Sequence, residues 1–134
     1  MNNLLYVEEN NTLGFGEYTL AKKSKVEDFE YQGDLYKVKT FSDITKLEKN
    51  GLFVYESVPG TKVNEFSLTD SKMCFIVSGQ KVAQITVGLE PEKEYAVTVG
   101  EKDLGVLITN VSGKLSLVVD VETCESVKVS VEKQ

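Results

Sequence analysis

The sequence contains no histidine, no arginine and no tryptophan among its 134 residues. Histidine is the usual proton shuttle near neutral pH and the commonest metal ligand, so its absence excludes Ser-His-Asp and Cys-His catalytic relays. Arginine supplies a planar, two-pronged grip on carboxylates and phosphates that lysine does not reproduce. These absences favour a protein that binds over one that catalyses, and no motif in the sequence points to a cofactor or a metal.

Acidic residues outnumber basic ones, since 21 aspartates and glutamates accompany 15 lysines and the net charge is −6. Nucleic-acid binding depends on clustered positive charge, so we expect no nucleic-acid partner. No apolar run approaches the ~20 residues of a membrane span, and residues 1–5 do not open a secretory signal. We therefore expect a cytoplasmic protein without a membrane partner.

Cysteine and proline are also scarce, with two residues of each. Two thiols cannot build a disulfide-rich scaffold, and without an export signal we expect both to be reduced. Cys74 lies in the apolar run 73–77 and is expected to be a buried structural thiol. Cys124 is flanked by acidic residues, which disfavour the thiolate, so neither cysteine is a candidate nucleophile.

Apolar and polar residues alternate with a period of two, and β-branched residues are dense after residue 60. The strands predicted there are 63–68, 73–78, 83–88, 95–99, 106–109, 114–121 and 127–132. Seven strands at a spacing of about 8–12 residues, with turn signals between them, are typical of an antiparallel sandwich. We therefore predict an all-β protein in which residues 61–134 form a seven-stranded, antiparallel, immunoglobulin-like β-sandwich.

The alternation also predicts which side chains of the last strands face the core. The expected inward rows are Tyr95, Val97 and Val99, then Leu115, Leu117, Val119 and Val121, and finally Val127, Val129 and Val131. The cross-sheet disulfide and the core tryptophan of immunoglobulin domains are both missing. The immunoglobulin-like prediction therefore depends on strand spacing alone.

Residues 1–60 differ in composition, because they hold nine of the twelve aromatic residues. The strands predicted there are 4–7, 14–20, 28–32, 35–40 and 52–58, with a tight hairpin turn at Gln32-Gly33-Asp34. Thr45 and Glu48 have the spacing of a capping box and Gly51 lies where a helix would stop, which predicts one or two helical turns. Proline and glycine at 59–60 mark a boundary between an N-terminal β-meander or hairpin region, 1–60, and the sandwich, 61–134.

The aromatic residues of the first half also suggest a binding surface. Tyr31, Tyr36 and Tyr55 are candidates to stack on a sugar ring, and Asp34 and Glu56 are candidates to accept hydrogen bonds from its hydroxyl groups. The alternative is that aromatic residues at strand spacing form core or cross-strand pairs. The four carboxylates Asp28, Glu30, Asp34 and Glu56 fit either an acid–base pair for glycoside hydrolysis or solvent-facing strand positions.

Three segments, YKVKT at 36–40, ITKLEKNG at 44–51 and VYESVPGT at 54–61, carry a family resemblance, and GKLSL at 113–117 adds to it. From about residue 14 to the C-terminus the chain resembles a family of short bacterial proteins that carry the label endosialidase. The resemblance implies a glycoside hydrolase, although its motifs identify no catalytic residue. Sialidases hold the substrate carboxylate with clustered arginines, which this chain lacks.

Three hypotheses follow. The first is a non-enzymatic all-β protein that assembles with itself or binds a protein partner through uncovered sheet edges, because such edges expose unpaired backbone groups. The second is a carbohydrate-binding module that uses the tyrosines of the first half. The third, disfavoured by the absence of arginine, is an endosialidase-like hydrolase that uses a pair of carboxylates.

Overall fold

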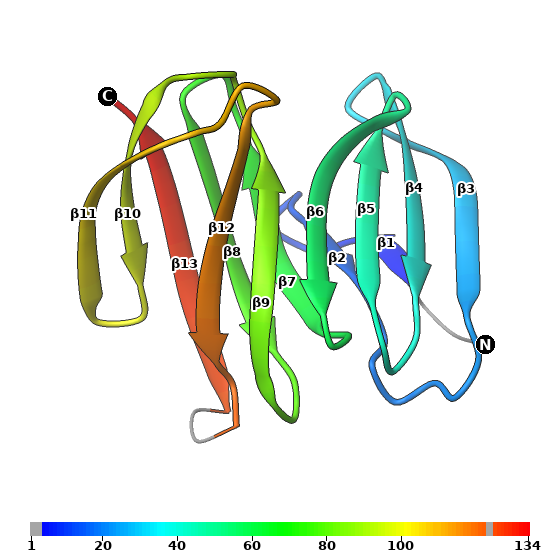
Figure 1. Ribbon diagram of the computed structural model, residues 1–134. Coiled ribbons are helices and arrows are strands. Elements are labelled where there is room, and N and C mark those ends of the chain that lie inside the picture. Colours follow the sequence, from blue (N-terminus) through cyan, green and yellow to red (C-terminus); the bar gives the residue numbers. More distant parts are fainter. Residues whose placement is uncertain (1–3, 123–124) are drawn as a thin grey trace.

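The structure is a computed structural model that describes residues 4–122 and 125–134 (Figure 1). These residues form strands, turns and loops and contain no helix. The thirteen strands are β1 (Leu5–Val7), β2 (Leu13–Phe15), β3 (Ser24–Tyr31), β4 (Asp34–Thr40), β5 (Thr45–Lys49), β6 (Leu52–Val58), β7 (Lys62–Leu68), β8 (Lys72–Ser78), β9 (Val82–Gly88), β10 (Glu94–Val99), β11 (Lys102–Ile108), β12 (Lys114–Asp120) and β13 (Ser126–Lys133).

The strands form two antiparallel sheets that pack face to face as a β-sandwich (Figure 1). Sheet A has seven strands in the order β1-β2-β7-β8-β13-β10-β11. Sheet B has six strands in the order β12-β9-β6-β5-β4-β3. The prediction of an all-β protein is confirmed, and β3 to β6 form the expected meander of consecutive hairpins.

Both sheets combine strands from the two sides of the boundary that was predicted at residue 60. Sheet A joins β1 and β2 to five later strands, and sheet B joins β9 and β12 to the meander β3 to β6. The strands of residues 61–134 therefore do not form a separate sandwich, because each sheet also contains strands of residues 1–60. The physical reason is that β7 and β9 bury their inner faces and pair their edges with strands of the first half.

The prediction of helical turns near Thr45 is wrong, because Thr45–Lys49 forms strand β5. This segment pairs with β4 on one side and β6 on the other, and Thr45 and Leu47 are fully buried on one face. The capping-box spacing is a local signal worth little without tertiary support. Pairing on both edges and burial of alternate side chains outweigh it.

The predicted inward rows of the late strands are confirmed. The buried side chains are Leu115, Leu117 and Val119 of β12, Val121 directly after it, and Val127, Val129 and Val131 of β13. Tyr95 and Val97 are buried as well, while Val99 is partly buried against the core. Period-two alternation was sufficient here because each of these strands has one dry face.

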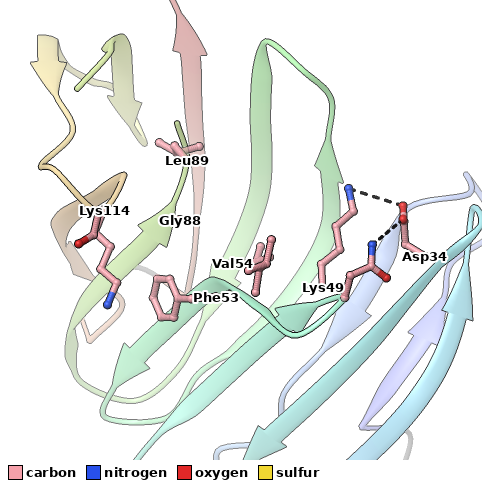
Figure 2. A pocket seen from close by; sticks show the side chains of 10 residues that line it. Asp34, Lys49, Phe53, Val54, Gly88, Leu89 and Lys114 are labelled. Carbon is pink, nitrogen blue, oxygen red and sulfur yellow. Dashed lines mark hydrogen bonds and ion pairs between the residues drawn. The ribbon is translucent and has the colours of Figure 1, made fainter. Parts of the chain in front are cut away.

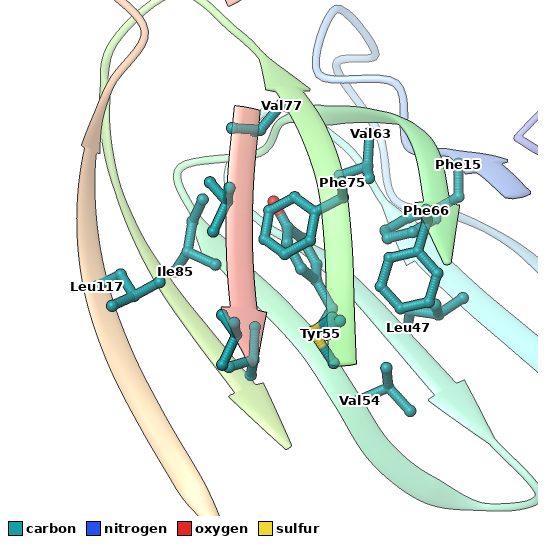
Figure 3. Packing of buried hydrophobic residues seen from close by; sticks show 14 of the residues in the cluster. Phe15, Leu47, Val54, Tyr55, Val63, Phe66, Phe75, Val77, Ile85 and Leu117 are labelled. Atoms are coloured by element: carbon teal, nitrogen blue, oxygen red, sulfur yellow. The ribbon is translucent and has the colours of Figure 1, made fainter. Parts of the chain in front are cut away.

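Four aromatic rings form the centre of the core (Figure 3). Tyr55 of sheet B lies edge-on to Phe15 and Phe75 of sheet A, with ring centroids 5.2 and 5.4 Å apart. Phe66 completes the group, 5.5 Å from Phe15 and 6.1 Å from Phe75. Edge-to-face pairs of this kind contribute about 0.5–1.5 kcal/mol beyond the area that they bury.

Beside these rings, buried hydroxyl groups form a hydrogen-bonded chain. Thr61 Oγ1 lies 2.7 Å from the Tyr55 hydroxyl and 2.8 Å from Ser57 Oγ. Thr45 Oγ1 donates to the carbonyl of Thr61 at 2.9 Å and accepts from its backbone N–H at 3.0 Å. Thr40 Oγ1 lies 2.8 Å from Thr45 Oγ1. The hydroxyl chain consists of Thr40, Thr45, Thr61, Ser57 and Tyr55, and the Ser57 and Tyr55 hydroxyls both bond to Thr61. It links three strands of sheet B to the segment that leads into sheet A.

Contrary to the prediction from the sequence, Cys74 is not buried in the core. It alternates with the buried residues Met73 and Phe75 along β8 and is only half-buried, with Sγ 3.7 Å from Ser130 Oγ. It therefore faces outward from the core, while Cys124 lies outside the described residues.

The described part of the chain has no helix of the length and apolar character that a membrane crossing requires.

The hydroxyl chain generates a stability prediction. Replacing Tyr55 with phenylalanine keeps the ring but leaves the buried Thr61 hydroxyl with one partner fewer, so we expect the free energy of unfolding to fall by about 1–3 kcal/mol. Denaturant-induced unfolding measures this change. Tyr18→Phe is the matched control, because the Tyr18 hydroxyl makes no hydrogen bond within the described residues. Equal stability of the two variants would contradict the prediction.

Candidate functional site

Two of the three predicted stacking residues are inside the sandwich. Tyr55 is fully buried at the centre of the aromatic cluster, and Tyr36 is 4% exposed. Burial raises the pKa of Tyr36 to about 12, with the negative charge of Asp34 adding to the shift, and it raises the pKa of Tyr55 further. Neither ring presents a face to a ligand, so the alternative interpretation, core packing, holds for both.

Tyr31 is the third predicted stacking residue and is partly exposed at the end of β3. Its ring packs edge-on against Tyr36, with centroids 5.7 Å apart, and its hydroxyl donates to the carbonyl of Asn11. Burial raises its pKa. Tyr31, Tyr36 and Asp34 therefore meet at the β3–β4 hairpin, whose predicted turn at Gln32 and Gly33 is confirmed.

Glu56 does not join this group. It follows Tyr55 on β6 and points to the opposite, outer face of sheet B, where it lies across from Lys46 and Thr86. Asp34 instead shares the face of Tyr36 on β4. The two predicted carboxylates are thus on different faces of the sheet and do not form an acid–base pair.

A groove of about 620 Å³ opens at the end of the sandwich beside this hairpin (Figure 2). Its wall from sheet B is the β5–β6 turn, where Asn50 and Gly51 have φ values of 51° and 79°. Such a two-residue turn with positive φ at both positions matches the twist of the paired strands. Gly88 forms part of the floor. A side chain at this position would collide with the carbonyl oxygen of Phe53, so the close approach of the two strands requires glycine.

The groove combines an apolar floor with charged rims (Figure 2). Val54 and Leu89 line the floor, and Lys114 Nζ lies 4.8 Å from the centre of the Phe53 ring. At the other rim Lys49 Nζ is 3.6 Å from an Asp34 carboxylate oxygen. The other Asp34 oxygen accepts a hydrogen bond of 2.8 Å from the Asn50 amide, and the Asn50 side-chain oxygen accepts one from the Leu35 N–H.

These contacts pair the polar groups at the Asp34 rim of the groove with one another. Asp34 is held by two partners and is the only predicted site residue that lines the groove. A smaller recess of about 230 Å³ shares Lys49, Gly88 and Leu89 and continues toward the β7–β8 turn. Among residues 4–122 and 125–134 no three carboxylate or thiol groups gather closely enough to hold a metal ion. The groove thus combines an apolar floor with a rim whose charged and amide groups contact one another.

The second surface is the β11 edge, which we define as Leu104, Val106 and Ile108 together with the backbone of β11. Among the strands of residues 4–122 and 125–134, β11 is the last of sheet A and pairs with β10 alone (Figure 1). Its three large apolar side chains are 40%, 52% and 63% exposed. Gly105 between them is exposed too, so both faces of the strand meet solvent. An apolar strand with one free edge is a template for strand addition.

The other three sheet edges are protected in recognisable ways. β1 has only three residues. β3 carries four exposed charged residues and is interrupted by a bulge with a positive φ of 56° at Asp28. β12 begins at Lys114 and ends at Asp120, and these two charged residues share its outer face with Ser116 and Val118. Short length, charge and bulges are the devices that limit edge pairing. On β11 the charged residues Lys102 and Asp103 and the bulge are confined to the start of the strand, which leaves residues 105–108 without them.

The sequence contains an apolar run at this edge that the alternation of apolar and polar residues alone does not explain. Val106, Leu107 and Ile108 are three consecutive apolar residues, so the strand is apolar on both faces. In a covered strand such a run indicates burial on both sides. Here only Leu107 is partly buried, packed against the core. The predicted strand, 106–109, also omitted the first half of β11.

Compared with protein-family models, with curated proteins and with solved structures, the chain has no significant match.

The buried tyrosines predict how stability responds to high pH. In the unfolded chain a tyrosine ionises near pH 10, whereas Tyr36 in the fold keeps its proton to about pH 12. A raised pKa in the folded state contributes stability that is present below pH 10 and is lost as the pH rises from 10 to 12. We therefore expect the free energy of unfolding to fall over this window, and less steeply in Tyr36→Phe.

Chemical denaturation at a series of pH values measures this slope. Tyr18→Phe serves as the control, because the Tyr18 hydroxyl makes no hydrogen bond within the described residues. An identical slope in wild type and Tyr36→Phe above pH 10 would show that Tyr36 ionises in the folded protein as freely as in the unfolded chain.

Proposed function

We propose that this protein is a non-enzymatic assembly module that adds a β-strand of another polypeptide along the β11 edge. The observation that carries the proposal is the combination of an unpaired edge with Leu104, Val106 and Ile108 exposed beside it. Strand addition supplies affinity through main-chain hydrogen bonds and specificity through alternate side chains. The apolar side chains of β11 are placed to be covered by those of an added strand.

The residue inventory supports binding over catalysis. The chain lacks histidine and arginine, and its candidate carboxylates Asp34 and Glu56 face different sides of sheet B. The carbohydrate-binding alternative loses two of its three stacking residues, because Tyr36 and Tyr55 are buried. An assembly function needs none of these groups, and it uses residues 105–108 of β11, which lie beyond the charged residues and the bulge at the start of that strand.

Strand addition predicts that a single charge on β11 weakens binding. The probe is a fluorescein-labelled peptide with the sequence of residues 102–109, and its fluorescence anisotropy is followed as protein is added. Because a lysine would place a charge among the apolar contacts, we expect Val106→Lys to bind the peptide at least about ten-fold more weakly than wild type, a loss of roughly 1.4 kcal/mol.

Val82→Lys is the matched control. Val82 is 46% exposed, close to the 52% of Val106, but it lies on β9, an interior strand of sheet B. We expect this variant to bind the peptide as wild type does. The proposal fails if the wild-type protein does not bind the peptide, or if both lysine variants weaken binding equally.

A further inference from the structure

We propose that the strand added at the β11 edge is β11 of a second copy of this chain, in an antiparallel pairing with twofold symmetry about Val106. The inference rests on the proposed strand addition and names its partner. It follows from the direction of the backbone groups, from the order of side chains along β11 and from the character of the other edges.

The hydrogen bonds of β10 show which backbone groups of β11 are free. The N–H of Gln134 donates to the carbonyl of Glu94 at 2.9 Å, so Glu94 directs its backbone groups toward the chain end that follows β13. Glu94 lies opposite Ile108 in the β10–β11 register. In an antiparallel sheet successive residues direct their N–H and C=O groups alternately to the two sides. Ile108 and Val106 therefore present both groups to the open edge.

A second hydrogen bond agrees with this assignment. The N–H of Thr109 donates to the carbonyl of Lys93 at 3.0 Å, so Thr109 faces the β10 side and its neighbour Ile108 faces away. When Val106 lies opposite the second copy's Val106, each valine donates its N–H to the carbonyl of the other. The twofold axis then passes between two residues that are both free to pair.

The side chains match in this register. Val106 lies opposite the second copy's Val106, and Ile108 lies across from the second copy's bulge, which holds Leu104, so exposed apolar residues come next to one another. Apolar cross-strand pairs contribute about 0.2–1 kcal/mol each. Lys102 and Asp103 fall beyond this apolar stretch and remain in water.

Neighbouring registers are less favourable. Centring the pair on Gly105 places Lys102 opposite Ile108 and Asp103 opposite Leu107, so charges face apolar side chains. Centring it on Leu107 leaves Leu104 opposite Asn110. The β10–β11 register shifts between Gly105 and Asp103, where the Asp103 carboxylate accepts from the Gly105 N–H at 2.8 Å, so Leu104 lies in a bulge and the regular part of the strand is 105–108. Only the register about Val106 pairs apolar with apolar throughout.

Pairing β11 with another edge of a second copy is disfavoured. An antiparallel partner β12, aligned on Val118, would set Asp120 opposite Leu104 and Ser116 opposite Ile108. β3 would bring its exposed charges and its bulge, and β1 is too short. A self-complementary pair is isologous and closes as a dimer, whereas unlike edges would build an open chain. The two seven-stranded sheets then become continuous.

The interface is one strand wide, which places it among weak contacts whose population depends on concentration. Cysteine cross-linking reads out its register. In a background with Cys74→Ser and Cys124→Ser, Val106→Cys puts two thiols across the twofold axis, and we expect copper phenanthroline to convert this variant to a disulfide-linked dimer. Ile108→Cys alone is the control on the same strand.

Two Ile108 positions are four residues out of register in this pairing, about 13 Å apart along the strands and beyond the roughly 7 Å between Cα atoms that a disulfide spans. We therefore expect Val106→Cys to cross-link at least about ten-fold faster than Ile108→Cys. Mixing Leu104→Cys with Ile108→Cys protein is expected to give the mixed dimer faster than either gives its own. Val82→Cys controls for random collision.

The register is overturned if Ile108→Cys or Val82→Cys links as fast as Val106→Cys. The second-copy inference is overturned if wild type also sediments as a monomer from micromolar to millimolar concentration. If the labelled peptide still distinguishes wild type from Val106→Lys in that case, strand addition stands and the partner is another polypeptide. If the peptide does not bind either, strand addition fails as well.

Discussion

The sandwich depends on Tyr55, which reaches from sheet B into the aromatic cluster of sheet A. Its ring contacts Phe15 and Phe75 edge-on, and its hydroxyl bonds to Thr61, where the chain passes between the sheets. A fully buried phenol without a partner would cost about as much as the ring contacts contribute. Because the hydroxyl chain satisfies that phenol, the largest side chain at the core fixes both the spacing of the sheets and the path of the connecting segment.

The same packing explains why the two ends of sheet A differ. At the β1 end, the first strands cover the core beside β7, and Leu5, Leu13 and Phe15 are buried. At the β11 end the core finishes with Tyr95 and Val97 of β10, and only Leu107 of β11 packs partly against it. β11 is therefore held by its pairing to β10 and little else, which leaves its apolar side chains exposed and available for contact with another chain.

Much of the fold was predictable because its strands have one dry face and one wet face. The rows on β12 and β13 followed from alternation, and the Gln32-Gly33 turn followed from its residues. The segment from Thr45 was misassigned, because a local capping pattern competed with pairing partners far away in the sequence. The tyrosines could not be placed for the same reason: whether an aromatic residue on a strand packs or binds depends on what covers it.

The sequence by itself determined the chemistry and the class of the protein. The absence of imidazole and guanidinium groups is a property of composition, and period-two alternation is a property of local order that indicates an all-β protein. The tertiary structure alone decided which strands lie at the edges, since strand order joins residues distant in the chain. Burial of Tyr36 and exposure of Val106 are consequences of that order, because solvent contact is set by the neighbouring sheet and not by the residue itself.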